Sequence, residues 1–290
     1  MCQGIADYVL TVDADEVVQF EDGFALDELN ADYGMVVKRR GNREYRVPSL
    51  LKTSCNWRWE GVLHEQPCCD VVIEGETVEG LTIVSPPEGA RSLDPHTYRR
   101  DALMLEAALI EDPDNSRTVF YLAQSYRDAD DYDNALRYYE RRLSMDGWHD
   151  EEFIALYQIG IVKTRRDDPW PECLDAFLTA QAHTPERIEP LYRIGMHYAR
   201  RKEWELAWLF LEKAAKADRI DPDKLFVEAD IYDWRAKLEA SVAAYWTDRH
   251  AESIALSETL LASDHLPKRL RARVEENIEH SKDALETEPA

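Results

Sequence analysis

The sequence predicts an α+β protein, in which a small β-rich region over residues 1–94 precedes an all-α repeat domain over residues 95–290. Two patterns indicate this organisation. Short β-branched runs separated by Gly, Asn and Pro fill the first third of the chain. Long helical segments with recurring small residues fill the remainder. A chain of 290 residues is long enough for two domains of ordinary size.

Composition excludes several classes of partner. The chain has 35 Lys and Arg against 58 Asp and Glu, a net charge of −23, which argues against nucleic acid as a partner because a phosphate backbone requires a positive surface. No apolar run approaches the ~20 residues of a membrane span, and the N-terminus does not resemble a signal peptide. Five cysteines without paired spacing indicate reduced thiols, so we expect a cytoplasmic protein.

The stretch over residues 7–16 places three carboxylates directly after an apolar run. Residues 8–12 predict a buried strand. Asp13 and Asp15 are two residues apart, so on an extended chain they project to the same side. Like charges this close repel each other, and a hard divalent cation, Mn²⁺ or Mg²⁺, could bridge them. The alternative is a strand that ends in a solvated acidic turn.

Further strands are expected in the first third, with few long helices between them. A Gly-Asn turn separates the first two, and Pro48 is expected to end the second. The predicted strands cover residues 34–38, 44–47, 57–65, 71–74 and 81–84.

Three motifs resemble those of family 2 glycosyltransferases with the GT-A fold and a helical-repeat tail. They are Asp13-Ala14-Asp15, Arg46-Val47-Pro48 and Trp59-Glu60-Gly61-Val62-Leu63-His64-Glu65. The resemblance implies that residues 1–94 are the C-terminal part of a GT-A-like domain that transfers a sugar from a nucleotide-sugar with a divalent metal. Only twelve residues precede Asp13, where that family has its nucleotide-binding units. We therefore expect this chain alone to be inactive.

The same resemblance implies roles for individual residues. Asp13 and Asp15 would bind the metal, Asp13 also the donor, and His64 would complete the coordination. Glu65 would be the general base, because a transferase must remove a proton from the acceptor. The alternative is that His64 and Glu65 are a structural pair.

Aromatic and loop residues complete the predicted substrate site. Trp57 and Trp59 share one face of a strand and could stack on a sugar, or they could pack in the core. Arg91 and Ser92 lie in a Gly-containing turn before a helix, which could cradle a diphosphate or serve as a capped linker.

The last two thirds predict helix pairs. Residues 118–128 and 132–145 form the first pair, and small residues recur at the same place in each second helix. These residues, Ala135, Cys173, Ala207 and Ser253, are 38, 34 and 46 apart. Their pattern resembles tetratricopeptide repeats, with an insertion over residues 218–234 expected to be an extra helix. Residues 266–285 are expected to form a polar capping helix.

The repeat domain predicts a second kind of function. A curved helical surface can bind a protein or peptide partner, or support a homodimer. Arg187 and Glu189 could belong to that surface or form a solvated ion pair. Two functions thus remain open: a metal-dependent glycosyltransferase, incomplete in this chain, and a non-catalytic tetratricopeptide-repeat scaffold for protein–protein interaction.

Overall fold

The computed structural model describes residues 4–26, 29–41, 43–71, 73–86, 94, 96–221 and 224–287. The chain forms two compact units, one of Met1–Arg166 with Pro222–Val227 and one of Asp167–Asp221 with Glu228–Ala290. The first helices therefore belong to the same unit as the β-rich region, whereas the sequence places a domain boundary near residue 94. No helix within the described ranges is long and apolar enough to cross a membrane.

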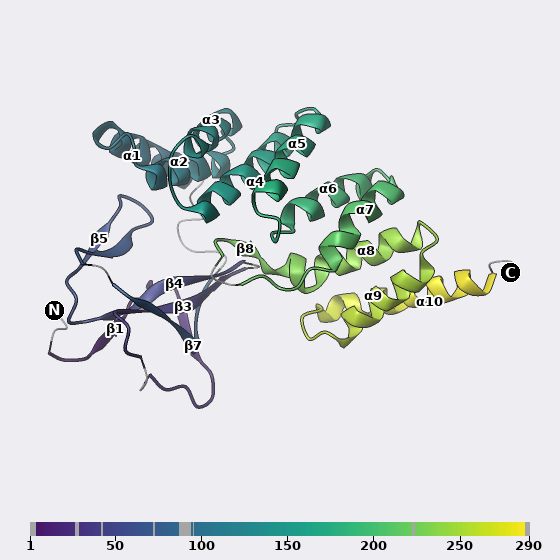
Figure 1. Ribbon diagram of the computed structural model, residues 1–290, viewed down its shortest axis with the longest axis horizontal. Coiled ribbons are helices and arrows are strands. Elements are labelled where there is room, and N and C mark those ends of the chain that lie inside the picture. Colours follow the sequence, from purple (N-terminus) through teal and green to yellow (C-terminus); the bar gives the residue numbers. More distant parts are fainter. Residues whose placement is uncertain are drawn as a thin grey trace. The chain divides into compact units, whose positions relative to one another are not determined.

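The first unit contains a sheet with strand order β1-β4-β3-β7-β2, and β8 also pairs with β4 (Figure 1). Strands β3 and β7 are parallel, and the pairs β1–β4, β3–β4 and β2–β7 are antiparallel. The strands are β1 (Tyr8–Leu10), β2 (Val17–Phe20), β3 (Tyr33–Arg40), β4 (Arg43–Lys52), β7 (Gly75–Ser85) and β8 (Val227–Glu228). The core of the sheet is built from Val36, Leu50, Val78, Leu81 and Ile83.

Two of these strands differ from the expected ones. β1 is an edge strand paired with β4 alone, and its three residues are half-buried rather than buried. β4 does not end at Pro48 but continues to Lys52. Proline has no N–H to donate, and the register with β3 shifts here, so that Gly34 faces Leu50 and Met35 faces Pro48. This bulge lets a proline lie inside the strand.

The segment expected to be extended over residues 57–65 folds back on itself. β5 (Trp57–Glu60) pairs antiparallel with β6 (Gln66–Cys69) as a separate hairpin. Gly61 begins the turn with φ 121°, a conformation that favours glycine. Residues 71, 73 and 74, part of another expected strand, are not in a strand, whereas β7 covers the strand expected over 81–84.

Helices α1 (Thr97–Glu111), α2 (Ser116–Asp128), α3 (Tyr132–Leu143) and α4 (His149–Arg165) complete the first unit. The structure thus confirms the first predicted helix pair in α2 and α3. Side-chain caps fix where both helices begin. Asn115 Oδ1 accepts the Thr118 N–H at 2.9 Å, and Asp131 Oδ1 accepts the Asn134 N–H at 3.2 Å.

The second unit is all helical apart from its share of β8. Its helices are α5 (Trp170–His183), α6 (Glu189–Arg200), α7 (Trp204–Ala215), α8 (Ala236–Tyr245), α9 (His250–Ala262) and α10 (Arg271–Thr287). Helix α10 confirms the expected C-terminal helix. A Cβ added to Gly195 of α6 would lie 2.5 Å from Leu211 Cγ of α7, so the close approach of these helices requires glycine.

A repeated turn reveals the helical period in the backbone. Asp130, Asp167, Lys202 and Asp248 have φ between 57° and 62°, and each stands between the two helices of one pair. They are 37, 35 and 46 residues apart, which reproduces the long step predicted before the fourth copy. In three of these turns, the N–H of the residue after the left-handed one donates to the carbonyl five residues before it. This bond is typical of a right-handed helix that ends at a single left-handed residue.

The insertion is not the extra helix predicted over residues 218–234. Its described residues form an irregular stretch, the short strand β8 and a π-helical turn, η2 (Ile231–Arg235), which leads directly into α8.

Candidate interaction surfaces

A lysine of the same sheet pairs with two carboxylates of the acidic cluster that follows β1. Lys38 Nζ lies 2.5 Å from Glu16 Oε1 and 3.6 Å from Asp13 Oδ2, and Ser85 Oγ donates to Glu16 Oε1 at 2.5 Å. Only 4% of the Glu16 side chain is exposed. Burial by itself raises the pKa of Glu16, but the hydrogen bonds from Lys38 and Ser85 outweigh it, so that this pKa is lowered. The Lys38 ammonium is therefore one cation that this cluster holds.

The predicted metal ligands are not brought together. Asp13 and Asp15 are exposed, and the ligand atoms of Asp13, Asp15 and His64 do not all lie within 4.8 Å of one another. As placed, these side chains do not fit a shared Mn²⁺ or Mg²⁺, so no chemistry is assigned to a metal here. Binding of either ion stays a prediction, which a Mn²⁺ titration of the wild type and of Asp15→Ala would measure.

His64 and Glu65 lie in the turn of the β5–β6 hairpin, which contacts helix α2. The His64 ring stacks on Tyr121, with ring centroids 4.0 Å apart, and its backbone has φ 54°. Arg117 Nη2 donates to the His64 carbonyl at 3.2 Å, and the Arg117 guanidinium lies over Tyr121. His64 therefore joins the hairpin to the helix. Glu65 is exposed, and its role as a base stays a prediction.

The remaining predicted binding residues are Trp57, Trp59, Arg91 and Ser92. Trp57 packs edge-on against Tyr33 and donates its Nε1–H to the Lys52 carbonyl at 2.9 Å, which supports the packing alternative for this ring. Trp59 is 51% exposed. Arg91 and Ser92 lie outside the described residues, and their role in binding a diphosphate stays a prediction.

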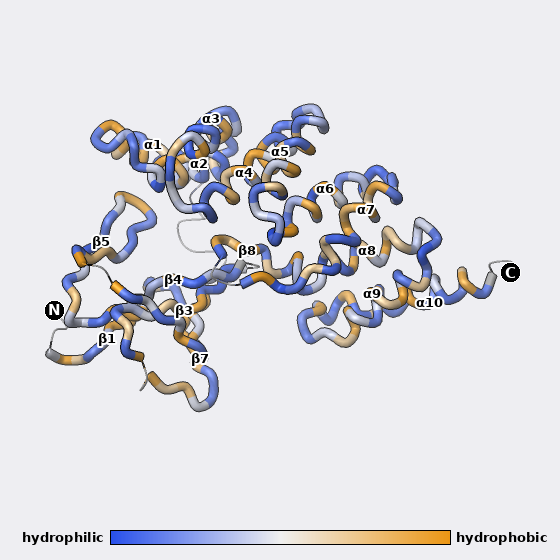
Figure 2. The backbone as a smooth tube through the Cα atoms, in the orientation of Figure 1, coloured by the Kyte–Doolittle hydropathy of each residue, from blue (hydrophilic) through white to orange (hydrophobic). Residues whose placement is uncertain are grey.

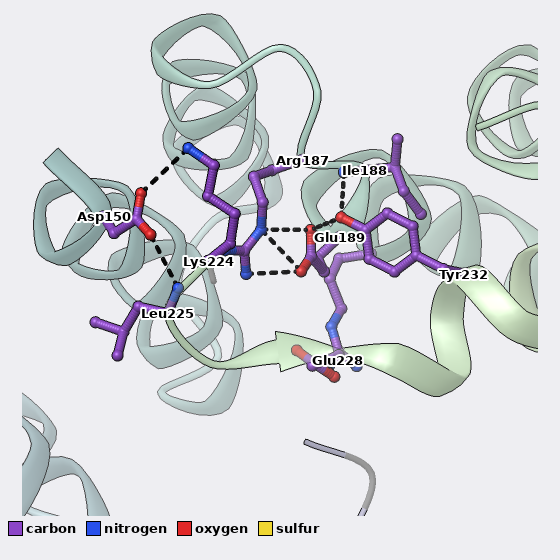
Figure 3. A network of polar contacts seen from close by, with 9 residues as sticks. Asp150, Arg187, Ile188, Glu189, Lys224, Leu225, Glu228 and Tyr232 are labelled. Atoms are coloured by element: carbon purple, nitrogen blue, oxygen red, sulfur yellow. Dashed lines mark hydrogen bonds and ion pairs between the residues drawn. The ribbon is translucent and has the colours of Figure 1, made fainter. Parts of the chain in front are cut away.

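In the second unit, Arg187 and Glu189 form a buried ion pair, so the alternatives of a surface site and a solvated pair are both wrong (Figure 3). The side chains are 1% and 0% exposed, and Arg187 Nη2 lies 2.7 Å from Glu189 Oε1. Tyr232 Oη donates to Glu189 Oε2 at 2.6 Å and accepts the Ile188 N–H at 3.2 Å. Burial, with the nearby Glu189 charge, raises the pKa of Tyr232. This network fixes the insertion to the start of α6.

In the first unit, the same insertion is fixed to the start of α4 (Figure 3). Asp150 Oδ2 accepts the Leu225 N–H at 2.9 Å, and Asp150 Oδ1 lies 3.5 Å from Lys224 Nζ. Phe226 packs edge-on against Tyr45 of β4, with ring centroids 5.6 Å apart. Residues 224–226 are therefore held to α4 and to the sheet within the first unit.

A row of aromatic rings lies at one edge of the second unit. Trp170 and His197 stack face to face with centroids 3.4 Å apart, and Trp170 Nε1 donates to Tyr198 Oη at 3.2 Å. Further along, Trp204 and Trp246 stack with centroids 5.7 Å apart. We call these five residues the aromatic edge. None is buried, and Trp246 is 57% exposed.

The helix termini explain why these rings gather. α5 begins at Trp170, α6 ends just after Tyr198, α7 begins at Trp204 and α8 ends just before Trp246. Consecutive helices of this unit pack against each other and run in alternating directions. The start of one helix therefore lies beside the end of the next, at the same edge of the unit. The burial of His197, with the positive charge of Arg201 beside it, lowers the pKa of this imidazole.

Sequence reasoning did not find the aromatic edge. Its signal was present, because aromatic residues stand within four positions of the left-handed turn residues Asp167, Lys202 and Asp248. Reading the repeats by their turns, rather than by their small residues alone, would have brought these rings together.

No family model matches this chain, and no curated protein sequence matches it. Solved structures are similar to about two thirds of the chain. MamA is 16% identical, with 66% of this chain and 90% of MamA covered and a TM-score of 0.40. YrrB, a TPR protein with an unusual peptide-binding site, is 18% identical (63% and 84% covered, TM-score 0.46). A tetratricopeptide repeat protein from Parabacteroides merdae is 19% identical (68% and 77% covered, TM-score 0.43).

The expected membership of the family 2 glycosyltransferases, with its GT-A fold and Asp-x-Asp site, is wrong. Two of the three similar structures are described as tetratricopeptide-repeat proteins, and none of the three is described as a glycosyltransferase. The structure gives the physical reasons. Asp13 and Asp15 follow an antiparallel edge strand, and Lys38 Nζ lies 3.6 Å from Asp13 Oδ2. The repeat architecture rests on the helix pairs and their recurring turns.

Proposed function

We propose that this chain is a tetratricopeptide-repeat scaffold that binds a protein or peptide segment on the aromatic edge of its second unit. The proposal replaces sugar transfer with binding. The cytoplasmic location predicted from composition is part of the same proposal.

The observation that supports this function is the aromatic edge itself, in which Trp246 is exposed and the other four rings are half-buried. Tryptophan and tyrosine offer large, stiff contact surfaces, and they are enriched where proteins bind one another. Here the rings follow successive helix ends of one unit, so a single extended segment could contact several of them. Trp246 is the most exposed of the five, and we assign it the largest share of the binding energy.

Charge indicates the chemistry of the partner. The chain has a net charge of −23, so long-range repulsion disfavours an acidic partner. Near the aromatic edge, Arg201 pairs with Glu203 and Arg249 pairs with Glu205, so these basic groups already have acidic partners. The surface therefore suits a neutral or basic segment with apolar or aromatic side chains.

The experiment is selection of peptides from a random phage-displayed library against the folded full chain. Selected peptides are then labelled with fluorescein and titrated by fluorescence polarisation. We expect Trp246→Ala and Trp170→Ala to weaken binding at least about tenfold, a loss of about 1.4 kcal/mol. Trp148→Ala is the matched control, since Trp148 is a 49% exposed tryptophan in the first unit. Equal affinity of all three variants, or no selected peptide, would refute the proposal.

A further inference from the structure

The outer face of α1 carries an apolar stripe that nothing within the described residues covers. Leu103 is 64% exposed, Met104 48% and Ile110 82%, and Ala107 between them is also exposed. We call these four residues the α1 stripe. Leu103, Ala107 and Ile110 are three or four positions apart and share one side of the helix, and Met104 lies at the border of that side. Exposed apolar residues gathered on one helix face indicate a contact surface.

The opposite side of α1 is already used. Ala102, Leu105 and Leu109 are buried, and α1 packs against α2. Hydrophobic residues therefore occur on both sides of this helix. Figure 2 shows the hydrophobic stretches along α1. A helix that needs only one neighbour is apolar on one face and polar on the other, so α1 has one apolar face more than the described fold requires.

The last helix of the series is different. The exposed residues of α10 include Arg273, Glu275, Glu276, Glu279 and Lys282. Helical-repeat arrays need polar faces on their terminal elements to stay apart from one another. Helix α10 exposes one large apolar residue, Leu285, whereas α1 exposes three.

Charges at the two ends of α1 indicate what covers the stripe. Arg99 and Arg100 are exposed at its start, where Arg100 already pairs with Asp94, and Glu111, Asp112 and Asp114 are exposed at or just beyond its end. In an antiparallel pair of identical helices, each start lies beside the other's end. Opposite charges would then meet at both ends, whereas a parallel pair would place like charges together.

We infer that α1 packs antiparallel against α1 of a second copy of this chain, around a two-fold axis near Ala107. One register matches both the apolar stripe and the charges at the helix ends. It places Leu103 opposite Ile110, and Arg99 opposite Asp114, in each half of the dimer. The small side chain of Ala107 lets the two helices approach at the axis. Such a contact is isologous, so the assembly closes at two copies.

The size of the contact sets its strength. A helix of 15 residues is about 22 Å long, so one helix pair is a small interface by comparison with stable dimers. The dimer should therefore dissociate on dilution. This assembly uses the first unit and is independent of the peptide site proposed on the second.

The test is sedimentation velocity of the full chain over a range of concentrations at 0.15 M salt, where screening limits the effect of net charge. We expect a reversible monomer–dimer equilibrium. Leu103→Glu with Ile110→Glu should raise the dissociation constant at least about tenfold. Leu209→Glu, at a 61% exposed leucine on α7, is the matched control and should leave the constant unchanged.

Two further variants test the register. Arg99→Glu should weaken the dimer, and adding Asp114→Arg should restore it, because the pair is reversed in both halves. Ala107→Cys should form a disulfide-linked dimer under mild oxidation, whereas Ala251→Cys on α9 should not. A protein that stays monomeric at every concentration would overturn the inference. So would a dimer whose dissociation constant is unchanged by Leu103→Glu with Ile110→Glu.

Discussion

Replacing Glu189 by Gln tests whether the buried network of the second unit holds the insertion in place. The substitution keeps the shape of the side chain and removes its charge. Arg187, 1% exposed, then keeps a buried guanidinium without its carboxylate. Removing one member of a fully buried ion pair typically costs about 3–5 kcal/mol. We expect a loss in this range, because both side chains are shielded from water.

Two companion variants separate charge from packing. Tyr232→Phe removes one hydrogen bond to a carboxylate and leaves the Ile188 N–H without its phenol acceptor, so we expect a smaller loss of about 1.5–3 kcal/mol. Arg187→Met combined with Glu189→Leu replaces both charges by apolar side chains. This double variant should recover much of the stability lost by Glu189→Gln.

The assay is hydrogen exchange of α6 and residues 228–235, together with urea unfolding. Exchange is needed because a chain with two units need not unfold in a single step. Glu189→Gln should speed exchange in both segments and leave the β3–β4 ladder unchanged. A Glu189→Gln protein within 0.5 kcal/mol of wild type, with unchanged exchange, would refute the assigned role of the pair.

Three further substitutions test other parts of the structure. Lys38→Met leaves the buried Glu16 carboxylate without its ammonium, so urea unfolding should show a loss of about 1–3 kcal/mol, which adding Glu16→Gln should largely reverse. The pKa of His197 is lowered on folding, so the folded protein favours the neutral imidazole. The stability that the neutral ring contributes is present above the ordinary pKa of about 6.5 and is lost as pH falls through the folded pKa. NMR titration should therefore place that pKa below 6.5, and His197→Gln should flatten the loss of stability in acid; a normal pKa contradicts this. Gly195→Ala pushes a methyl group against Leu211 and should cost about 1–3 kcal/mol by thermal unfolding, whereas an unchanged melting temperature would contradict the close packing.

The helical part of the fold was predictable because its evidence is local. Small residues at a fixed interval, such as Ala135 and Ala207, mark where helices of a pair approach, and both are fully buried. Side-chain caps such as Asn115 and Asp131 mark helix starts within a few residues. Such signals depend on neighbours in sequence, so they survive without knowledge of the whole structure.

The first third was harder to predict because its outcome depends on distant partners. The Asp13-x-Asp15 spacing is compatible with a metal site, but Lys38, more than twenty residues away, decides where the charge is neutralised. Likewise Arg187 and Glu189 look like a surface pair in sequence. The insertion buries them by placing Tyr232 against Glu189. Neither partner could be identified from spacing alone.

Hydrogen–deuterium exchange with a selected peptide tests the central claim, that this protein acts by binding a segment at the aromatic edge. The account predicts slower exchange at residues 167–172, 197–206 and 245–250 of the second unit when the peptide is bound, and loss of this protection in Trp246→Ala. Protection confined to the sheet or to α1–α4 would contradict the claim.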